Sequence, residues 1–487
     1  MGEAAERRVL DAVPDGLLID GSWGPAKGHR TFGVEDPATK QELRTVADAS
    51  AEDSVAALDA AAAAQPAWAA TPPRERAEIL RAAFEAMTRR ADDLALLMTL
   101  EHGKPIAESK GEIAYAAEFF RWFSEEASRI SGTYAAAPAG NLRLLTMRQP
   151  VGPCLLITPW NFPMAMGTRK IGPAIAAGCT MVMKPARQTP LSMLMLAQIL
   201  QEAGLPNGVL NVVTAHDPAV VSEPLLADPR LRKLSFTGST GVGSKLIEMS
   251  AGQVLRTSME LGGNAPFLVF ADADVEKAVE GAMIAKMRNM GQACTSANRF
   301  LVHSSVAADF TERLVDKMAT LVAGRGTENG VTLGPLIDQV AVDKVDGLVR
   351  DAVDKGAKLL LGGKAGDGPG YFYEPTVLVD IPNGVGLSRE EIFGPVAAIR
   401  EFTDDDAAIA EANATEYGLV AYAYTADLTR ALRVAEALES GMVGINVGLV
   451  SNPAAPFGGV KQSGLGREGG AVGIEEYLET KYVALPS

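Results

Sequence analysis

Residues 153–184 read PCLLITPWNFPMAMGTRKIGPAIAAGCTMVMK, and their order of apolar and helical segments decides the fold. The runs CLLITP (154–159) and TMVMKP (180–185) are short and mostly apolar, as buried strands are. The segment between them, from about 164 to 177, has the length and pattern of a helix. A strand, a helix and a second strand in this order predict a right-handed crossover and a parallel sheet.

The same alternation continues on the C-terminal side. A helix is predicted from about 190 to 203, followed by the apolar run LNVVT (210–214), the run LRKLSFTG (231–238) and another helix from about 241. A second series of apolar runs begins at APFLVF (265–270) and ends at GMVGINV (441–447). Each series is long enough for its own core, so we predict an α/β protein with two doubly wound open sheets.

Other segments lie outside these two series. Residues 51–100 have the pattern of two amphipathic, alanine-rich helices, separated at Pro72–Pro73. Residues 141–149 and the tail YLETKYVAL (477–485) alternate apolar and polar side chains, which is typical of exposed strands. Two interpretations are equally open for these strands: arms that pair with another subunit, or ordinary edge strands of this one.

Composition excludes several classes of protein. The 487 residues carry a net charge of −15, and an acidic surface does not supply the basic footprint that nucleic acid requires. Three cysteines exclude a disulfide scaffold and favour a reducing, cytoplasmic location. The longest uncharged stretch, 149–168, contains four prolines, so we expect no membrane span. The four histidines form no ligand-spaced cluster, so no metal site is expected.

Three polar side chains in loops are candidates for chemistry. Cys294 lies in the polar run RNMGQACTS, whereas the other two cysteines adjoin apolar strands. Glu260 stands where a strand runs into glycines and is a candidate base, or else a surface turn residue. Asn161 lies in the rigid turn TPWNFP and is a candidate oxyanion donor, or else a helix cap.

A glycine-rich turn, GSTGVG (238–243), follows a predicted strand and opens a helix, where backbone N–H groups can bind phosphate. Its spacing differs from the usual dinucleotide fingerprint, and for this motif taken alone an ordinary tight strand-to-helix turn is the better interpretation. The following Ser244-Lys245 reverses the order that a nucleoside-triphosphate loop requires, which argues against a kinase.

Taken together, the motifs resemble those of the aldehyde dehydrogenase superfamily. Seven of them occur in order over residues 20–485: TPWNFP, MKPA, SFTGST, MELGGNAP, GQAC, EEIFGP and PFGGVKQSGLGRE. The resemblance implies a Rossmann-like cofactor domain (1–130 and 151–262) and a catalytic domain (263–465). It also implies a small β oligomerisation element (131–150 and 466–487), which predicts a homodimer or homotetramer.

The resemblance also implies NAD(P)-dependent oxidation of an aldehyde to an acid through a thioester. Cys294 would be the nucleophile, Asn161 and the backbone N–H of Cys294 the oxyanion donors, and Glu260 the general base. Residues expected to contact the cofactor are Trp160, Lys184, Gly238, Ser239, Leu261, Glu391 and Phe393.

One departure from the family pattern concerns the cofactor. Many members carry an acid three residues after the lysine of MKPA, where it binds the adenosine ribose hydroxyls. Here that position is Arg187, and a cation beside Lys184 would attract a 2′-phosphate rather than repel it. We therefore predict a preference for NADP, with NAD possible, unless Arg187 points to solvent.

Within the family, the chain is most similar to succinate-semialdehyde dehydrogenases. Arg169, Arg288 and Ser451 match positions that hold the substrate carboxylate in that subfamily, and a guanidinium suits a carboxylate. The prediction is a short aldehyde with an ω-carboxylate, succinate semialdehyde. The alternatives are glutarate semialdehyde or a broader range of aldehydes. A catalytically inactive relative is unexpected, because Asn161, Glu260 and Cys294 are all present.

Overall fold

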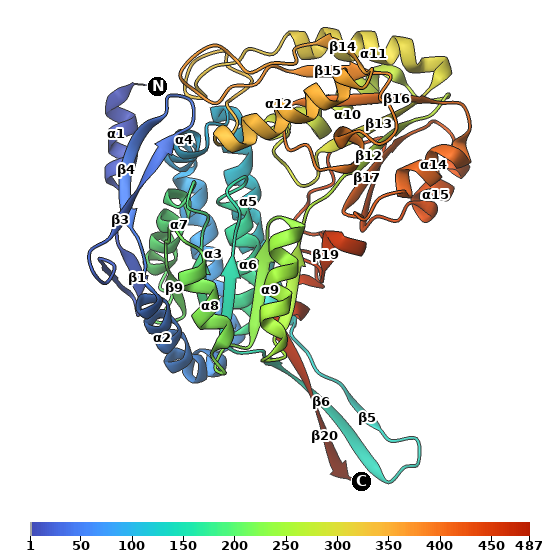
Figure 1. Cartoon of the computed structure of the whole chain (residues 1–487). Helices are drawn as coiled ribbons and strands as arrows, with labels where there is room; N and C mark the ends of the chain where they lie inside the picture. The colour runs from blue at the N-terminus through green and yellow to red at the C-terminus, as the bar shows by residue number, and fades with distance from the viewer. Residues whose placement is uncertain (1) are drawn as a thin grey trace.

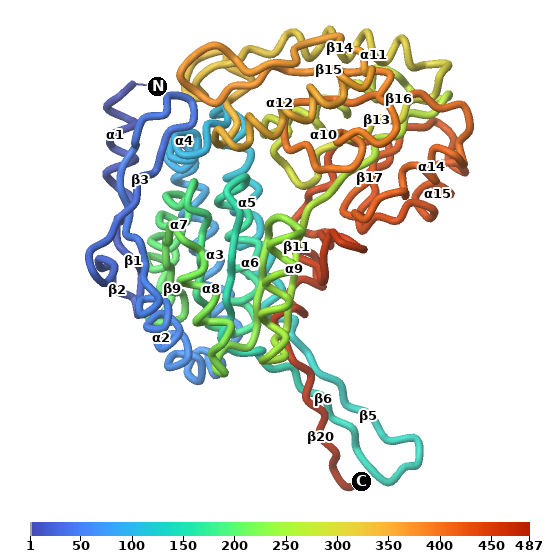
Figure 2. Tube along the Cα trace, viewed as in Figure 1, coloured from blue at the N-terminus to red at the C-terminus, as the bar shows by residue number. Residues whose placement is uncertain are grey.

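The computed structural model describes residues 2–487 and shows two α/β bodies and a projecting β arm (Figures 1 and 2). The two bodies correspond to the two predicted series of strands, and the prediction of two open, mostly parallel sheets is confirmed. The arm extends away from both bodies and carries the C-terminus at its tip (Figure 1).

The first sheet has eight strands in the order β19-β11-β10-β7-β8-β9-β1-β2. Its centre is parallel, and antiparallel pairings occur only toward its ends, at β19 on one side and at β1 and β2 on the other. The strands are β1 Leu17–Ile19, β2 Ser22–Gly24, β7 Cys154–Ile157, β8 Met181–Lys184, β9 Leu210–Val212, β10 Lys233–Thr237, β11 Arg256–Glu260 and β19 Gly464–Leu465.

Helices cover both faces of this sheet (Figure 1). α6 Ala165–Ala177 and α7 Leu191–Glu202 pack on one face, and α2 Ala51–Ala70 and α9 Thr240–Ala251 on the other, with α8 Ala219–Ala227 between α2 and α9. The helices α3 Pro73–Arg89, α4 Ala91–His102 and α5 Ile106–Glu126 form an outer layer on α6 and α7, with α1 Glu3–Asp11 on α4 and the short η1 Ala127–Arg129 after α5. Every residue of α6 is buried, which places the centre of the predicted strand–helix–strand unit in the core.

The prediction of two helices over 51–100 was wrong, because the chain forms three. The additional break falls at Arg90, whose backbone leaves the helical range at φ −102° and ψ 13°. Asp92 and Asp93 then stand in the first turn of α4, where acidic side chains stabilise the positive end of a new helix. No proline or glycine stands at this break, so neither of the strongest sequence signals for it is present.

The second sheet has seven strands in the order β14-β15-β16-β13-β12-β17-β18. All neighbours are parallel except β14, which pairs antiparallel with β15 at one edge. The elements are β12 Ala265–Val269, β13 Ala297–His303, β14 Lys358–Leu361, β15 Thr376–Val379, β16 Val396–Phe402, β17 Val420–Tyr424 and β18 Met442–Ile445, with α10 Val275–Met287, η2 Arg288–Gly291, α11 Ser304–Ala319, α12 Gln339–Asp354, α13 Gly386–Arg389, α14 Asp405–Asn413 and α15 Leu428–Ala437.

The arm is a three-stranded antiparallel sheet in the order β20-β6-β5. Its strands are β5 Tyr134–Ala136, β6 Leu142–Pro150 and β20 Leu478–Pro486. The two segments predicted as exposed strands pair with each other along nine residues of this chain.

The residues before β20 lie outside the arm. The 3₁₀ helices η3 Lys461–Ser463 and η4 Gly473–Tyr477 flank the two-residue strand β19, and η4 packs against α6. A two-stranded sheet near the N-terminus, β3 Thr31–Asp36 and β4 Gln41–Ala47, was not predicted. Within residues 2–487, no helix is long and apolar enough to cross a membrane.

Candidate active site

A cavity of about 420 Å³ opens where the two α/β bodies meet. Open parallel sheets bind their ligands at the carboxyl ends of the strands. The carboxyl ends of β7 and β11 lie at this cavity, because residues at or just after the end of each strand line it. Nine of the predicted site residues line it: Trp160, Asn161, Gly238, Ser239, Glu260, Leu261, Cys294, Glu391 and Phe393. The other five, Lys184, Arg187, Arg169, Arg288 and Ser451, lie outside this lining.

Cys294 is held by an unusual backbone. Asn289, Met290 and Gly291 all have positive φ, which coils the chain tightly just before the cysteine. Burial raises the pKa of the Cys294 thiol to about 12; the charge of Arg169 lowers it, and Glu391 and Glu260 raise it further. The thiol is therefore protonated near neutral pH, and a base must remove its proton before it can act as a nucleophile.

Asn161 is fixed on the same side of the cavity. Its side-chain amide donates to the backbone carbonyl of Gln292, two residues before Cys294, at 3.1 Å. The backbone carbonyl of Asn161 accepts hydrogen bonds from Lys104 Nζ at 2.9 Å and from Asn289 Nδ2 at 3.0 Å. An amide N–H that is positioned against the loop of the nucleophile has the geometry of an oxyanion donor.

Glu260 ends β11 and is 3% exposed. Burial raises the pKa of Glu260 well above the ordinary carboxyl value, and the nearby negative charge of Glu468 raises it further. One of its carboxylate oxygens, Oε2, has no hydrogen-bond partner within residues 2–487. A buried carboxyl with a raised pKa and a free oxygen can accept a proton from a thiol or from water.

A group of buried charges lies behind Glu260. Glu468 accepts a hydrogen bond from Lys170 Nζ at 2.6 Å and forms an ion pair with Arg169, and all three side chains are almost fully buried. Sequence reasoning missed Lys170 and Glu468, although the quoted motif GLGRE contains the glutamate. Nothing in the sequence links two residues that are 298 positions apart.

The two arginines predicted to bind substrate have different surroundings. The Arg169 guanidinium forms an ion pair with Glu468 and lies over the Phe457 ring, with its Cζ 4.1 Å from the ring centroid. Arg288 stacks over Phe162 at 4.9 Å and has no ion pair in the part of the chain that the structure describes. Both charges lower the pKa of Cys294, which places them near the thiol. Ser451 is half-buried in the loop after β18.

The start of α9 provides backbone donors at the cavity. Ser239 is the N-cap of α9, and its side chain makes no capping hydrogen bond. Gly238 and Ser239, which line the cavity, stand immediately before this twelve-residue helix. The free backbone N–H groups of the first helical turn therefore lie at the cavity, where they can bind an anion. These residues fit the pyrophosphate of a dinucleotide cofactor.

Glu391 and Phe393 form the opposite wall. The Glu391 carboxylate accepts from the backbone N–H of Gly263 at 3.3 Å, and burial raises its pKa to about 7. Phe393 has a left-handed backbone, φ 57°, and its ring meets Trp160 edge-on at 5.4 Å. The strained backbone thus falls at a residue that lines the cavity.

The predicted ribose and 2′-phosphate contacts lie next to this cavity, at the end of β8. Lys184 donates only to the carbonyl of Pro185, and burial lowers its pKa to about 8. Arg187 is exposed and meets His216 Nε2 at 3.0 Å, and it pairs with no carboxylate among residues 2–487. Two cations without carboxylate partners fit an additional phosphate group.

The comparisons with known proteins agree with this geometry. The profile of the aldehyde dehydrogenase family matches residues 23–483. A succinate-semialdehyde dehydrogenase of Paenarthrobacter nicotinovorans is 61% identical, over 91% of this chain and 98% of its own. A glutarate-semialdehyde dehydrogenase of Pseudomonas aeruginosa is 52% identical, over 96% of both. The crystal structure of an NADP-dependent enzyme from Escherichia coli superposes with a TM-score of 0.97 at 52% identity, covering 98% of this chain and 99% of the other.

Proposed function

This chain belongs to the aldehyde dehydrogenase family, and from that membership we propose that it oxidises succinate semialdehyde to succinate with reduction of NADP. The observation that carries the choice of substrate is Arg288, a cation near the Cys294 thiol that has no ion pair among the described residues. Its charge reaches the thiol, and the neighbouring carboxylate of Glu108 acts on it without forming an ion pair. Such a guanidinium selects an aldehyde that brings its own carboxylate.

The protein's own residues perform the acyl chemistry. Glu260, in its deprotonated form, takes the proton from the Cys294 thiol, and the thiolate attacks the aldehyde carbon to give a thiohemiacetal. The Asn161 amide and the Cys294 backbone N–H stabilise the oxyanion. When bound, NADP supplies the acceptor for the hydride that leaves this carbon, which converts the thiohemiacetal to a thioester. After the thiol proton has passed from Glu260 to solvent, Glu260 takes a proton from the water that hydrolyses the thioester to the acid, and this proton returns to the departing Cys294 thiolate.

Two groups of residues would hold the cofactor. Gly238 and Ser239 at the start of α9 would bind the pyrophosphate, with Trp160, Leu261, Glu391 and Phe393 around the nicotinamide half. Lys184 and Arg187 would hold the adenosine ribose and its 2′-phosphate. The E. coli structure that superposes on this chain is described as NADP-dependent, which supports the same preference here.

The decisive experiment compares aldehydes of two to six carbons, with and without an ω-carboxylate, against both cofactors. We expect the highest kcat/KM for the four-carbon ω-carboxylated aldehyde with NADP. The second candidate is the five-carbon homologue, since a relative that is 52% identical is named a glutarate-semialdehyde dehydrogenase. Equal kcat/KM for aldehydes with and without the carboxylate would contradict the proposed role of Arg288.

We also propose that the enzyme works as a homodimer or homotetramer in the cytoplasm. The arm supports self-association, because it leaves large apolar side chains on its surface, with Tyr134 67% and Tyr482 56% exposed. Three free cysteines, one of them the proposed nucleophile, suit a reducing compartment.

A further inference from the structure

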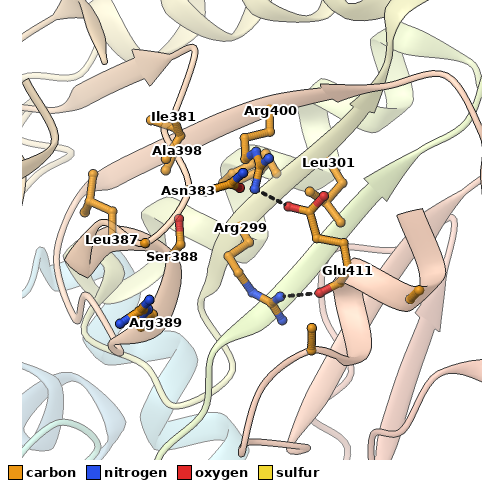
Figure 3. Close-up of a pocket in the computed structure, with 14 residues that line it drawn as sticks. Arg299, Leu301, Ile381, Asn383, Leu387, Ser388, Arg389, Ala398, Arg400 and Glu411 are labelled. Atoms are coloured by element: carbon orange, nitrogen blue, oxygen red, sulfur yellow. Dashed lines mark hydrogen bonds and ion pairs between the residues drawn. The ribbon is translucent and has the colours of Figure 1, made fainter. Parts of the chain in front are cut away.

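A second cavity, of about 410 Å³, lies on the second sheet away from the residues that line the active site (Figure 3). Its walls are β13, β16, α14 and the loop around α13. The volume falls in the range of small-molecule sites. In Figure 3, Arg299 and Arg400 reach from neighbouring strands toward Glu411, and Arg389 lies on the loop that forms the other side.

The lining of this cavity is cationic. The fourteen lining residues include three arginines, Arg299, Arg389 and Arg400, and a single carboxylate, Glu411. Arg400 forms an ion pair with Glu411 at 2.6 Å. This pairing leaves two positive charges, Arg299 and Arg389, in a chain whose net charge is −15.

Neither of the two remaining arginines is neutralised by a carboxylate contact. Arg299 is 8% exposed, and its guanidinium donates only to the backbone carbonyls of Asn264, Glu411 and Ala412. Carbonyl dipoles satisfy its donors but leave its charge in place. The carboxylates of Glu411 and, outside the lining, Glu416 act on this charge without contacting it, Glu411 more strongly. The Arg389 side chain is exposed, and its guanidinium has no hydrogen bond or ion pair to any of residues 2–487.

We propose that this cavity is a binding site for a small dianion that carries carboxylate or phosphate groups. Arg299 and Arg389 supply the charge, and Asn383 and Ser388 line the cavity beside them with polar groups. The donors of Arg299 are held by carbonyls, so it contributes charge alone. The Arg389 guanidinium can bind either anion type through paired N–H donors, so the cavity would accept either.

The site is connected to the active site by short contacts. The Ser388 carbonyl accepts from Asn264 Nδ2 at 3.1 Å, and the Asn264 carbonyl accepts from Arg299 at 3.0 Å. Asn264 follows Gly263, whose N–H binds the Glu391 carboxylate. Arg389 itself is two residues before Glu391. A dianion that draws Arg389 toward Arg299 would thus shift the segment that carries Glu391 and Phe393.

Calorimetry on the enzyme saturated with NADP tests the binding, because the cofactor then occupies its own phosphate subsites. The probes are inorganic phosphate and malonate, one for each anion type. We expect Arg389→Gln to weaken binding of at least one probe about tenfold or more. Arg433→Gln, an exposed arginine on α15, removes the same charge elsewhere and should leave binding unchanged.

Arg288→Ala separates the new site from the substrate site, and we expect it to leave probe binding intact. Loss of probe binding in Arg288→Ala but not in Arg389→Gln would place the anion at the active site and overturn the proposal. Equal binding by the wild type, Arg389→Gln and Arg433→Gln would overturn it as well. Neither readout depends on the identity of the aldehyde.

The KM for NADP tests the coupling and rests on the proposed function. The bound probe should change this KM at least threefold in the wild type and leave it unchanged in Arg389→Gln. An unchanged KM in the wild type at saturating probe would overturn the connection to Glu391, while the calorimetric result decides the site itself.

Discussion

At the residue scale, the two groups that must exchange a proton are both held neutral by burial. The pKa of Cys294 is raised to about 12, and that of Glu260 is raised well above its ordinary value. A base with a raised pKa becomes active only as the pH rises through that pKa, so kcat/KM should increase toward alkaline pH. The Glu468 carboxylate adds to this effect, because its charge opposes ionisation of Glu260.

The first prediction concerns Glu260→Gln. We expect kcat to fall about 100-fold or more, since the amide cannot accept the proton. The alkaline increase in kcat/KM should disappear as well, as measured by reduced-cofactor absorbance across a pH series. Glu248→Gln, an exposed glutamate on α9, should retain both the rate and the profile. An unchanged profile in Glu260→Gln would assign the base to another group.

The second prediction concerns cofactor choice. Arg187 is exposed and has only His216 as a partner, so its charge is available to a 2′-phosphate. Arg187→Glu places a carboxylate there, which repels the phosphate and can bind ribose hydroxyls instead. The ratio of kcat/KM for NADP over NAD should fall by about tenfold or more. The same change at Arg433 should leave the ratio as in the wild type, and a ratio unaffected by Arg187→Glu would exclude this residue from the site.

The third prediction concerns substrate recognition by Arg288. Removing a charge-assisted hydrogen bond costs about 1.5–3 kcal/mol, so Arg288→Ala should raise KM for succinate semialdehyde about tenfold or more. An aldehyde without a carboxylate should show no comparable change. Parallel losses for both substrates would mean that Arg288 supports the loop of Cys294 rather than the substrate.

At the element scale, the helices, strands and turns that could be predicted from the sequence are those that neighbouring residues determine. The strand–helix–strand order around α6 and the glycine turn before α9 were predictable, because a few adjacent residues determine them. The break at Arg90 was not, because no proline or glycine marks it. The hairpin of β3 and β4 was also missed: Asp36-Pro37 marks its turn, but neither strand is an apolar run. Within the site, Cys294 and Asn161 lie in recognisable loops, whereas Lys170 meets Glu468 only through the tertiary fold.

The connection between α5 and the turn that holds Asn161 is another long-range feature. Lys104 pairs with Glu112 at 2.6 Å, and both side chains are 1% exposed. Lys104 also donates to the Asn161 carbonyl, and Glu112 accepts from the N–H groups of Met164 and Ala165 at the start of α6. One buried ion pair thus joins α5, the catalytic turn and α6.

The fourth prediction follows from this pair. Lys104→Met leaves the Glu112 charge buried without its partner, which should cost about 3–5 kcal/mol of unfolding free energy. Urea denaturation measures the loss. Lys110→Met, on α5, removes a pair with Asp92 that is half or more exposed and should cost about 1 kcal/mol or less. Equal effects of the two substitutions would show that the buried pair contributes nothing beyond a surface one.

At the scale of the whole molecule, the arm leaves most of its side chains exposed or only half-buried. It projects from both bodies (Figure 1), and its nine-residue pairing of β20 with β6 is held at the base by Arg256, which donates to the carbonyls of Glu475 and Leu478. Its exposed apolar side chains are Tyr134, Met147, Tyr482 and Leu485. A surface of this kind on a separate sheet is suited to contact with a second copy.

The fifth prediction tests that contact. Tyr482→Glu places a charge on the apolar surface of β20 without breaking the backbone pairing with β6, so the oligomer should dissociate to a smaller species in analytical ultracentrifugation. Val254→Glu, which alters an 88% exposed side chain after α9, should leave the assembly intact. Because the active-site cavity is lined by residues outside the arm, the dissociated variant should still bind NADP. An unchanged sedimentation coefficient for Tyr482→Glu would mean that the arm surface is not the site of self-association.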